Sequence, residues 1–82
     1  MKLQITRKAE KELNKLPGSV AKNIAKQLLG LSKTPFPANS KKLQGQDNYR
    51  LRVGSFRVIY CVEAKTKTVT ILRVADRKTI YR

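Results

Sequence analysis

The feature that most constrains the fold of this chain is the alternation of arginine with apolar residues in its last third. Residues 49–53 read Tyr-Arg-Leu-Arg-Val, and residues 56–60 read Phe-Arg-Val-Ile-Tyr. Because side chains alternate between the two faces of a strand, this period predicts β-strands with apolar residues on one face and Arg50 and Arg52 on the other. The glycine-containing pair 54–55 is the two-residue link expected of a β-hairpin.

The other patterns predict an α+β fold in a single domain spanning residues 1–82. Two apolar stripes at helical spacing indicate a helical hairpin, with Thr6 and Ser19 as N-caps. The order β-α-α-β-β-β predicts an antiparallel sheet with the N-terminal helical hairpin packed on one face. In chain order, the expected elements are a strand at 2–6, helices at 7–16 and 20–31, a loop at 34–40 with a tail at 41–45, and strands at 49–53, 56–63 and 68–74.

Charge defines the kind of partner that the chain needs. Nineteen basic residues face five acidic ones, for a formal net charge of +14 over 82 residues. Such a surface repels itself and favours a polyanion, either nucleic acid or an acidic protein that covers it. No apolar run approaches the ~18 residues of a spanning helix, and residues 1–8 do not resemble a secretory signal. We therefore expect a cytoplasmic protein with no membrane partner.

The inventory of reactive side chains excludes several chemistries. The chain has no histidine, and Cys61 is its one cysteine, so it can form no internal disulfide and no zinc site of the Cys/His type. We expect no metal and no cofactor, and Cys61 as a small buried residue in the middle of a strand. Without histidine, proton transfer would have to rely on tyrosine, lysine or carboxylate groups, and arginine could stabilise negative charge.

Three ordered segments resemble one protein family. They read K-L-x-G at 42–45, Y-R-L-R-V-G-x-F-R-V-I-Y at 49–60 and V-T-I-L-R-V-x-x-R-x-x-I-Y-R at 69–82. Together they resemble the RelE/ParE toxin superfamily, most closely its RelE-like mRNA interferase branch. The resemblance implies a type II toxin that cleaves mRNA in the ribosomal A site without metal and so inhibits translation. It also implies two partners, a cognate antitoxin and the ribosome with its mRNA and 16S rRNA.

The resemblance implies catalytic roles for three residues. Arg57 falls on the arginine that contacts the scissile phosphate, Arg77 on a second arginine, and Tyr81 on a C-terminal tyrosine that orients or activates the reacting base. We expect Arg57 and Arg77 to stabilise transition-state charge and Tyr81 to stack or act as a base. Asp76 stands where some relatives have a histidine, and it is either an alternative base or a salt-bridge partner of Arg77.

A second set of residues is expected to bind RNA without taking part in proton transfer. The set consists of Arg50, Arg52, Arg73 and Lys78. Relatives often have lysines in place of the first two, and arginine cannot lose its proton in a protein. This departure shifts the role of general base toward Tyr81.

Each assignment has a simpler alternative. Arg50 and Arg52 could form the solvated face of an edge strand, Arg57 could pair with Glu63 or Asp76, and Tyr81 could be an anchor. Tyr60 is expected in the core. Two other functions also fit, namely a ParE-like inhibitor of DNA gyrase without nuclease activity and a non-catalytic nucleic-acid-binding module.

Overall fold

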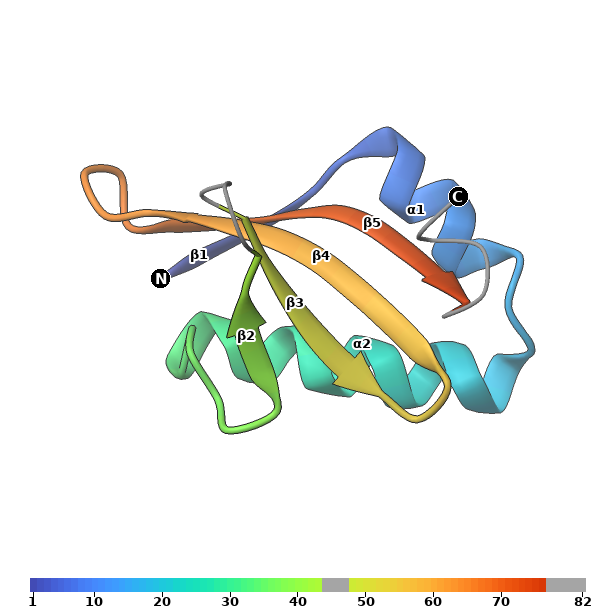
Figure 1. The fold of residues 1–82 in the computed structure, drawn as a ribbon. Helices are drawn as coiled ribbons and strands as arrows, with labels where there is room; N and C mark the ends of the chain where they lie inside the picture. The colour runs from blue at the N-terminus through green and yellow to red at the C-terminus, as the bar shows by residue number, and fades with distance from the viewer. Residues whose placement is uncertain (44–47, 77–82) are drawn as a thin grey trace.

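The computed structural model describes residues 1–43 and 48–76, which form a five-stranded sheet and two helices. Figure 1 shows α2 crossing beneath the sheet and α1 lying beside β5. This arrangement confirms the predicted α+β class with helices on one face. The elements are β1 (Lys2–Ile5), α1 (Arg7–Asn14), α2 (Gly18–Lys33), β2 (Ser40–Lys42), β3 (Asn48–Val53), β4 (Phe56–Glu63) and β5 (Thr68–Asp76).

The sheet is mixed rather than purely antiparallel, which corrects the prediction. Its strand order is β1-β5-β4-β3-β2, and β4 is the central strand, as expected. The pairs β2–β3, β3–β4 and β4–β5 are antiparallel, but β1 pairs in parallel with β5, with Leu3 opposite Val69. Parallel strands need a long crossover connection. The chain from α1 to β4 supplies it, so the pairing of β1 depends on residues far away in the sequence.

The core lies between the sheet and the helices. Ile24 and Leu28 of α2 are buried against Leu51, Tyr60 and other residues of the sheet, and the remaining residues of both helical stripes contact the same cluster. The predicted apolar stripes are therefore confirmed. Lys22, Lys26 and Lys33 of α2 are exposed, so the helix separates a buried apolar stripe from a charged one, as amphipathic helices in globular proteins do.

Element boundaries differ from the prediction where proline is involved. The second helix begins at Gly18 with Pro17 as its N-cap, and no side chain caps it, so the predicted capping role of Ser19 is wrong. Proline at this position has a φ of −54°, and its side chain has no oxygen that could accept a hydrogen bond from the first helical amides. The capping role of Thr6 is confirmed, because its side chain accepts a hydrogen bond from the Ala9 amide.

Strand β2 was not predicted. Ser40–Lys42 falls between a proline-rich loop and the tail of the predicted loop, and three residues are too few for a visible alternation. The segment becomes a strand because it pairs with β3, with Lys41 opposite Arg50. In the described parts of the chain, no helix is long and apolar enough to cross a membrane.

Candidate functional site

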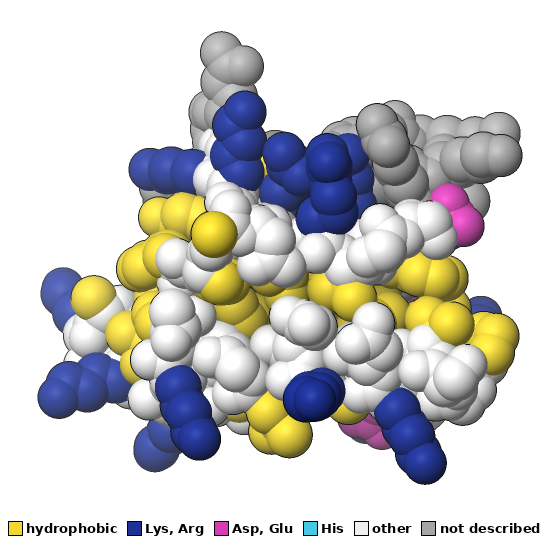
Figure 2. Space-filling view, turned by 90° about the horizontal axis from the view of Figure 1, so that it is seen from below, with side chains coloured by type: hydrophobic (Ala, Val, Ile, Leu, Met, Phe, Trp, Pro, Cys, Tyr) yellow, Lys and Arg dark blue, Asp and Glu magenta, His cyan; other side chains and the backbone are white. Residues whose placement is uncertain are grey.

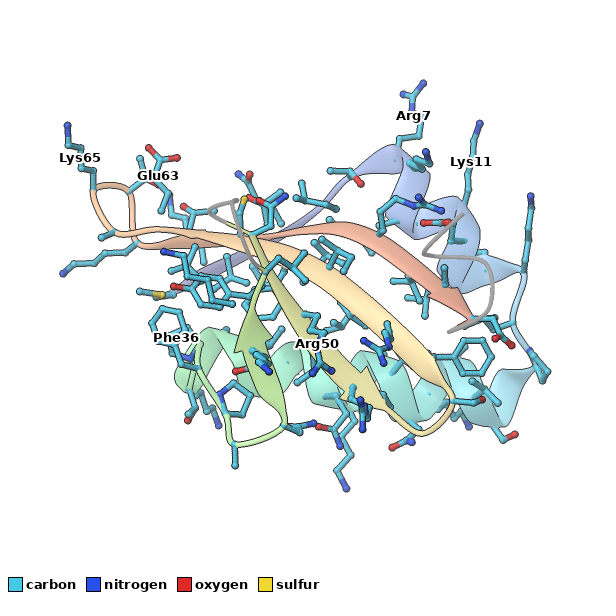
Figure 3. All side chains as sticks on the ribbon, in the orientation of Figure 1. Arg7, Lys11, Phe36, Arg50, Glu63 and Lys65 are labelled. Atoms are coloured by element: carbon cyan, nitrogen blue, oxygen red, sulfur yellow. The ribbon has the colours of Figure 1, made fainter. Side chains whose placement is uncertain are left out.

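The face of the sheet opposite the helices carries a basic surface. Register places Lys41 opposite Arg50, and Arg52 opposite Arg57, on three adjacent strands. These side chains have the opposite parity to the buried Leu51, so they point away from the core. Figure 3 shows Arg50 projecting from β3 in front of the sheet. The basic face is defined here as Lys41, Arg50, Arg52 and Arg57.

Like charges face each other across the strands of the basic face. Like-charged residues directly opposite each other destabilise a sheet, and two such pairs occur here, Lys41–Arg50 and Arg52–Arg57. Within residues 1–43 and 48–76, no carboxylate forms a salt bridge with Lys41, Arg50 or Arg52. In Figure 2, basic side chains lie close together along the top of the molecule. On the side of the helices, the basic side chains are scattered singly. This concentration of charge costs stability, and an anionic ligand would offset that cost.

Arg57 is the buried member of the basic face. Only 6% of its surface is exposed, whereas Arg52 opposite it is exposed. Glu63 is not its partner, because it lies six residues further along the same strand, about 20 Å away at 3.3 Å per residue, in the β4–β5 hairpin (Figure 3). In this conformation Arg57 offers an anion little of its surface.

Arg73, predicted to bind RNA, is held by an acidic residue of α1. Its Nη2 donates to Glu12 Oε2 at 2.9 Å, and the amide of Val74 donates to Glu12 Oε1 at 3.0 Å. Desolvation raises the pKa of Glu12, but these bonds and the nearby charge of Arg73 together lower it below its ordinary value. The hydrogen bond that Arg73 donates to Glu12 raises the pKa of Arg73. Arg73 therefore joins α1 to β5, and its role in RNA binding stays a prediction.

Of the C-terminal candidates from Asp76 onward, the structure describes only Asp76. Register places Asp76 opposite Phe56, on the parity of the core residues and not on that of Arg57. Arg77, Lys78 and Tyr81 lie outside the described residues, so their predicted roles stay predictions.

Tyr60 has the structural role that was expected of it, and Cys61 is less buried than expected. Tyr60 is fully buried, as predicted, and its hydroxyl donates to the Pro35 carbonyl at 2.7 Å. Burial raises the pKa of Tyr60, which makes it a poor base. Cys61 is a free thiol, half-buried rather than buried. No group of metal-ligating side chains occurs within the part of the chain that the structure describes.

Two site residues were not predicted from the sequence, namely Lys41, which belongs to the basic face, and Phe36, which lies near it. Lys41 was assigned to a loop, because only the pairing of β2 with β3 places it beside Arg50. Phe36 was also treated as part of a loop, yet it is exposed and contacts Tyr49. The available signal was a lone aromatic residue between two prolines, followed by two lysines before a strand. Such a signal is too weak by itself to indicate a site.

Comparison with known proteins identifies the family. A model of the ParE toxin of type II toxin–antitoxin systems matches residues 3–81. The putative toxin RelE1 of Methanocaldococcus jannaschii is 31% identical over 98% of this chain and 93% of its own length. Toxin RelG of Mycobacterium tuberculosis is also 31% identical, over 98% of this chain and 94% of its own length.

Solved structures agree with this result. The archaeal RelE–RelB complex from Pyrococcus horikoshii matches with a TM-score of 0.85 and 31% identity, covering 95% of this chain and 96% of the other. The RelBE2 toxin–antitoxin complex of Mycobacterium tuberculosis matches with a TM-score of 0.83 and 28% identity, covering 93% and 96%. The fold and the basic face thus belong to a small toxin domain. The chain is a member of the RelE/ParE superfamily of type II toxin–antitoxin toxins.

Proposed function

We propose that this protein is a ribosome-dependent endoribonuclease that cleaves mRNA in the ribosomal A site and thereby inhibits translation. The observation that carries the proposal is the basic face of the sheet, where register sets Lys41 opposite Arg50 and Arg52 opposite Arg57. Like charges placed opposite each other cost stability, whereas the phosphates of RNA would neutralise them. The relatives named RelE agree with the resemblance to RelE-like toxins, which implies RNA as the polyanion.

The proposed chemistry relies on positioning and charge. Arg50 and Arg52 hold the RNA backbone, and Arg57 and Arg77 stabilise the charge that develops on the scissile phosphate. Arg57 is 6% exposed, and any rearrangement that brings it into contact with the scissile phosphate draws on binding energy gained elsewhere on the RNA. Tyr81 stacks on a base or takes the proton from the 2′-hydroxyl, because arginine cannot act as a base.

We further propose that a cognate antitoxin holds the toxin inactive in the cytoplasm. Complexes of RelE-type toxins with RelB antitoxins have the same toxin fold as this chain. A net charge of +14 favours an acidic segment that wraps the basic face and competes with RNA for it.

The test is a translation assay with purified protein and message mapped by primer extension. Wild type should produce cuts at codon-phased positions on ribosomes. Arg57→Met keeps a long apolar side chain in the buried position and removes the charge, so cleavage should fall about 100-fold or more. Tyr81→Phe keeps the ring and removes the hydroxyl, which separates stacking from proton transfer. Lys22→Gln removes one charge from the exposed face of α2 and should cleave like wild type.

Intact message with folded wild-type protein would contradict the proposal. A second candidate then becomes the better one, because the matching family model is that of ParE toxins. A ParE-like toxin would inhibit supercoiling by DNA gyrase in vitro and leave ribosomes unaffected. A protein that binds RNA without affecting either assay would be a non-catalytic nucleic-acid-binding module.

A further inference from the structure

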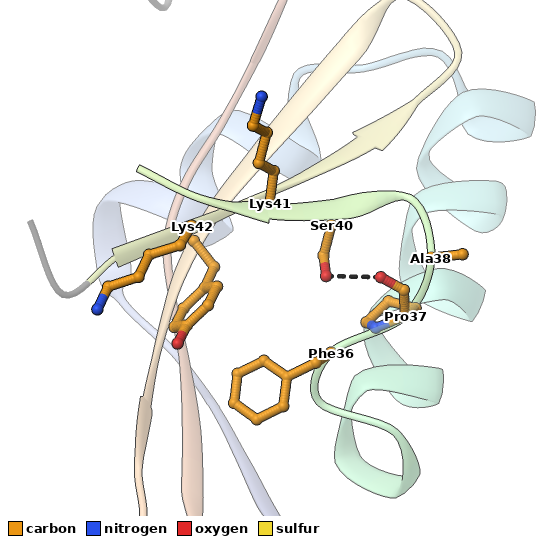
Figure 4. Close-up of a pocket in the computed structure, with 7 residues that line it drawn as sticks. Phe36, Pro37, Ala38, Ser40, Lys41 and Lys42 are labelled. Atoms are coloured by element: carbon orange, nitrogen blue, oxygen red, sulfur yellow. Dashed lines mark hydrogen bonds between the residues drawn. The ribbon is translucent and has the colours of Figure 1, made fainter. Parts of the chain in front are cut away.

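A hollow lies at the edge of the sheet beside β2, next to the basic face. Its volume is about 440 Å³, and its walls include the rings of Phe36 and Tyr49 and the side chains of Lys41 and Lys42. Figure 4 shows the Phe36 ring turned toward the hollow, with Lys42 extended along the rim and Lys41 leaving the other side of β2. The hollow thus combines flat aromatic surface with positive charge.

The aromatic wall is a column of three rings. The centroids of Phe36 and Tyr49 are 4.9 Å apart with planes tilted by 54°, and those of Tyr49 and Tyr60 are 5.7 Å apart and stacked. Tyr60 is fully buried, whereas 53% of Phe36 is exposed. The column therefore runs from the core to the surface and ends in an aromatic ring that is open to a further planar group.

Hydrogen bonds fix the loop that presents Phe36. The Tyr60 hydroxyl donates to the carbonyl of Pro35 at 2.7 Å, and the Ser40 hydroxyl donates to that of Pro37 at 2.7 Å. The side-chain amide of Asn39 donates to the Arg52 carbonyl at 2.9 Å, which ties the loop to β3. The two prolines restrict the backbone on both sides of Phe36. The exposed ring is thus held in place before any ligand arrives.

The hollow lies around the edge strand β2 from the basic face, because register pairs Lys42 with Tyr49 and Lys41 with Arg50, on opposite faces of the sheet. A neighbouring hollow of about 300 Å³ is lined by Arg50 and Arg52, and the two hollows share Ala38, Ser40 and Lys41. A chain of phosphates that binds both the arginines and Lys42 therefore passes around the edge of β2. The aromatic rings lie at the end of this path.

We propose that the hollow is a stacking subsite for one unpaired nucleobase of single-stranded RNA, with the adjoining phosphates against Lys41 and Lys42. Proteins bind single strands by this combination of a basic groove and aromatic rings on which bases stack. The proposal rests on RNA being the ligand of the basic face, as proposed above, but Arg57 does not line the subsite. It extends RNA recognition by one nucleotide beyond the arginines.

The test measures binding of a fluorescent single-stranded RNA of twelve nucleotides at low salt. Phe36→Leu keeps an apolar side chain and removes the ring, so affinity should fall about tenfold, within the range for loss of one stacked base. Lys42→Gln should also weaken binding and reduce its salt dependence. The matched controls are Leu29→Ala and Lys22→Gln, which alter exposed residues of α2 and should bind like wild type.

An abasic scan of the same RNA gives a readout that does not depend on the folding of a variant. Removal of the base that occupies the hollow should weaken binding to wild type about tenfold and leave binding to Phe36→Leu unchanged. The subsite is refuted, while the proposed function stands, if wild type binds RNA and Arg52→Gln weakens this binding but Phe36→Leu does not. If wild type binds no RNA, both fail. A Phe36→Leu variant that loses only antitoxin binding also refutes the subsite.

Discussion

Replacing Glu12 should destabilise the protein, because this side chain fastens α1 to the free edge of β5. Pairing of β1 with β5 ends at Ile71, so Val74 has no strand neighbour on that side. The Glu12 carboxylate takes the place of one, accepting from the Val74 amide at 3.0 Å and from Arg73 at 2.9 Å. Glu12→Ala removes both bonds, whereas Glu12→Gln keeps an acceptor and removes the charge.

The size of the effect follows from exposure. Hydrogen bonds to charged groups contribute about 1.5–3 kcal/mol, but exposed ion pairs contribute only about 0.2–1 kcal/mol. The Arg73 and Glu12 side chains are 35% and 21% exposed, so the pair lies between these limits. We expect Glu12→Ala to cost about 2 kcal/mol and Glu12→Gln about 1 kcal/mol, each kcal/mol lowering the Tm by about 4–8 °C for a domain of this size.

The effect should depend on pH in one direction. Burial raises the pKa of Glu12, but the bonds from Arg73 and Val74 and the charge of Arg73 outweigh it, so the folded-state pKa lies below the ordinary 4.5. The carboxylate therefore stabilises the fold fully above about pH 5, and this contribution is lost as the pH falls through the folded-state pKa. The difference between wild type and Glu12→Gln should shrink over that acidic range.

Urea unfolding followed by circular dichroism at several pH values measures these differences. Glu10→Gln is the matched control, because Glu10 is exposed in the first turn of the same helix and should change stability by less than about 0.5 kcal/mol. This role of Glu12 is refuted if Glu12→Gln is no less stable than Glu10→Gln at pH 7. It is refuted equally if the difference from wild type does not shrink as the pH is lowered below about 5.

Two further predictions concern the basic face and the hairpin. Arg52→Gln should reduce the slope of log affinity for single-stranded RNA against log salt by about 0.7, the value for one phosphate contact; an unchanged slope in a salt titration would exclude Arg52 from the interface. Gly54 has a φ of +59°, and a Cβ added there would meet nothing within 4 Å, so Gly54→Ala should cost about 1–2 kcal/mol through backbone strain alone. Gly30 lies inside α2, where an added Cβ also meets nothing within 4 Å, so Gly30→Ala should instead stabilise the protein by about 0.5–1 kcal/mol. Thermal unfolding measures both variants, and Tm values shifted in the same direction would contradict this difference.

Local patterns in the sequence determined much of the fold and the orientation of the site. The helical stripe through Ile24 and Leu28 is buried as its spacing predicts, and the turn at Gly54 connects the strands that period two indicates. The same alternation placed Arg50 and Arg52 opposite the core residues of their strand. These features depend on residues a few positions apart, so the chain itself fixes them through side-chain direction and turn geometry.

The tertiary structure alone decided which of these residues are neighbours. Lys41 reaches Arg50 only because β2 pairs with β3, and Glu12 meets Arg73 across 61 positions of sequence. Arg57 has the parity of a surface residue but is buried. The period of two in a strand indicates the face on which a side chain lies. Strand order, register and whether that face is covered depend on contacts between residues far apart in the sequence. The sequence thus determined the charge and direction of the arginines, and the fold determined which of them stand exposed together.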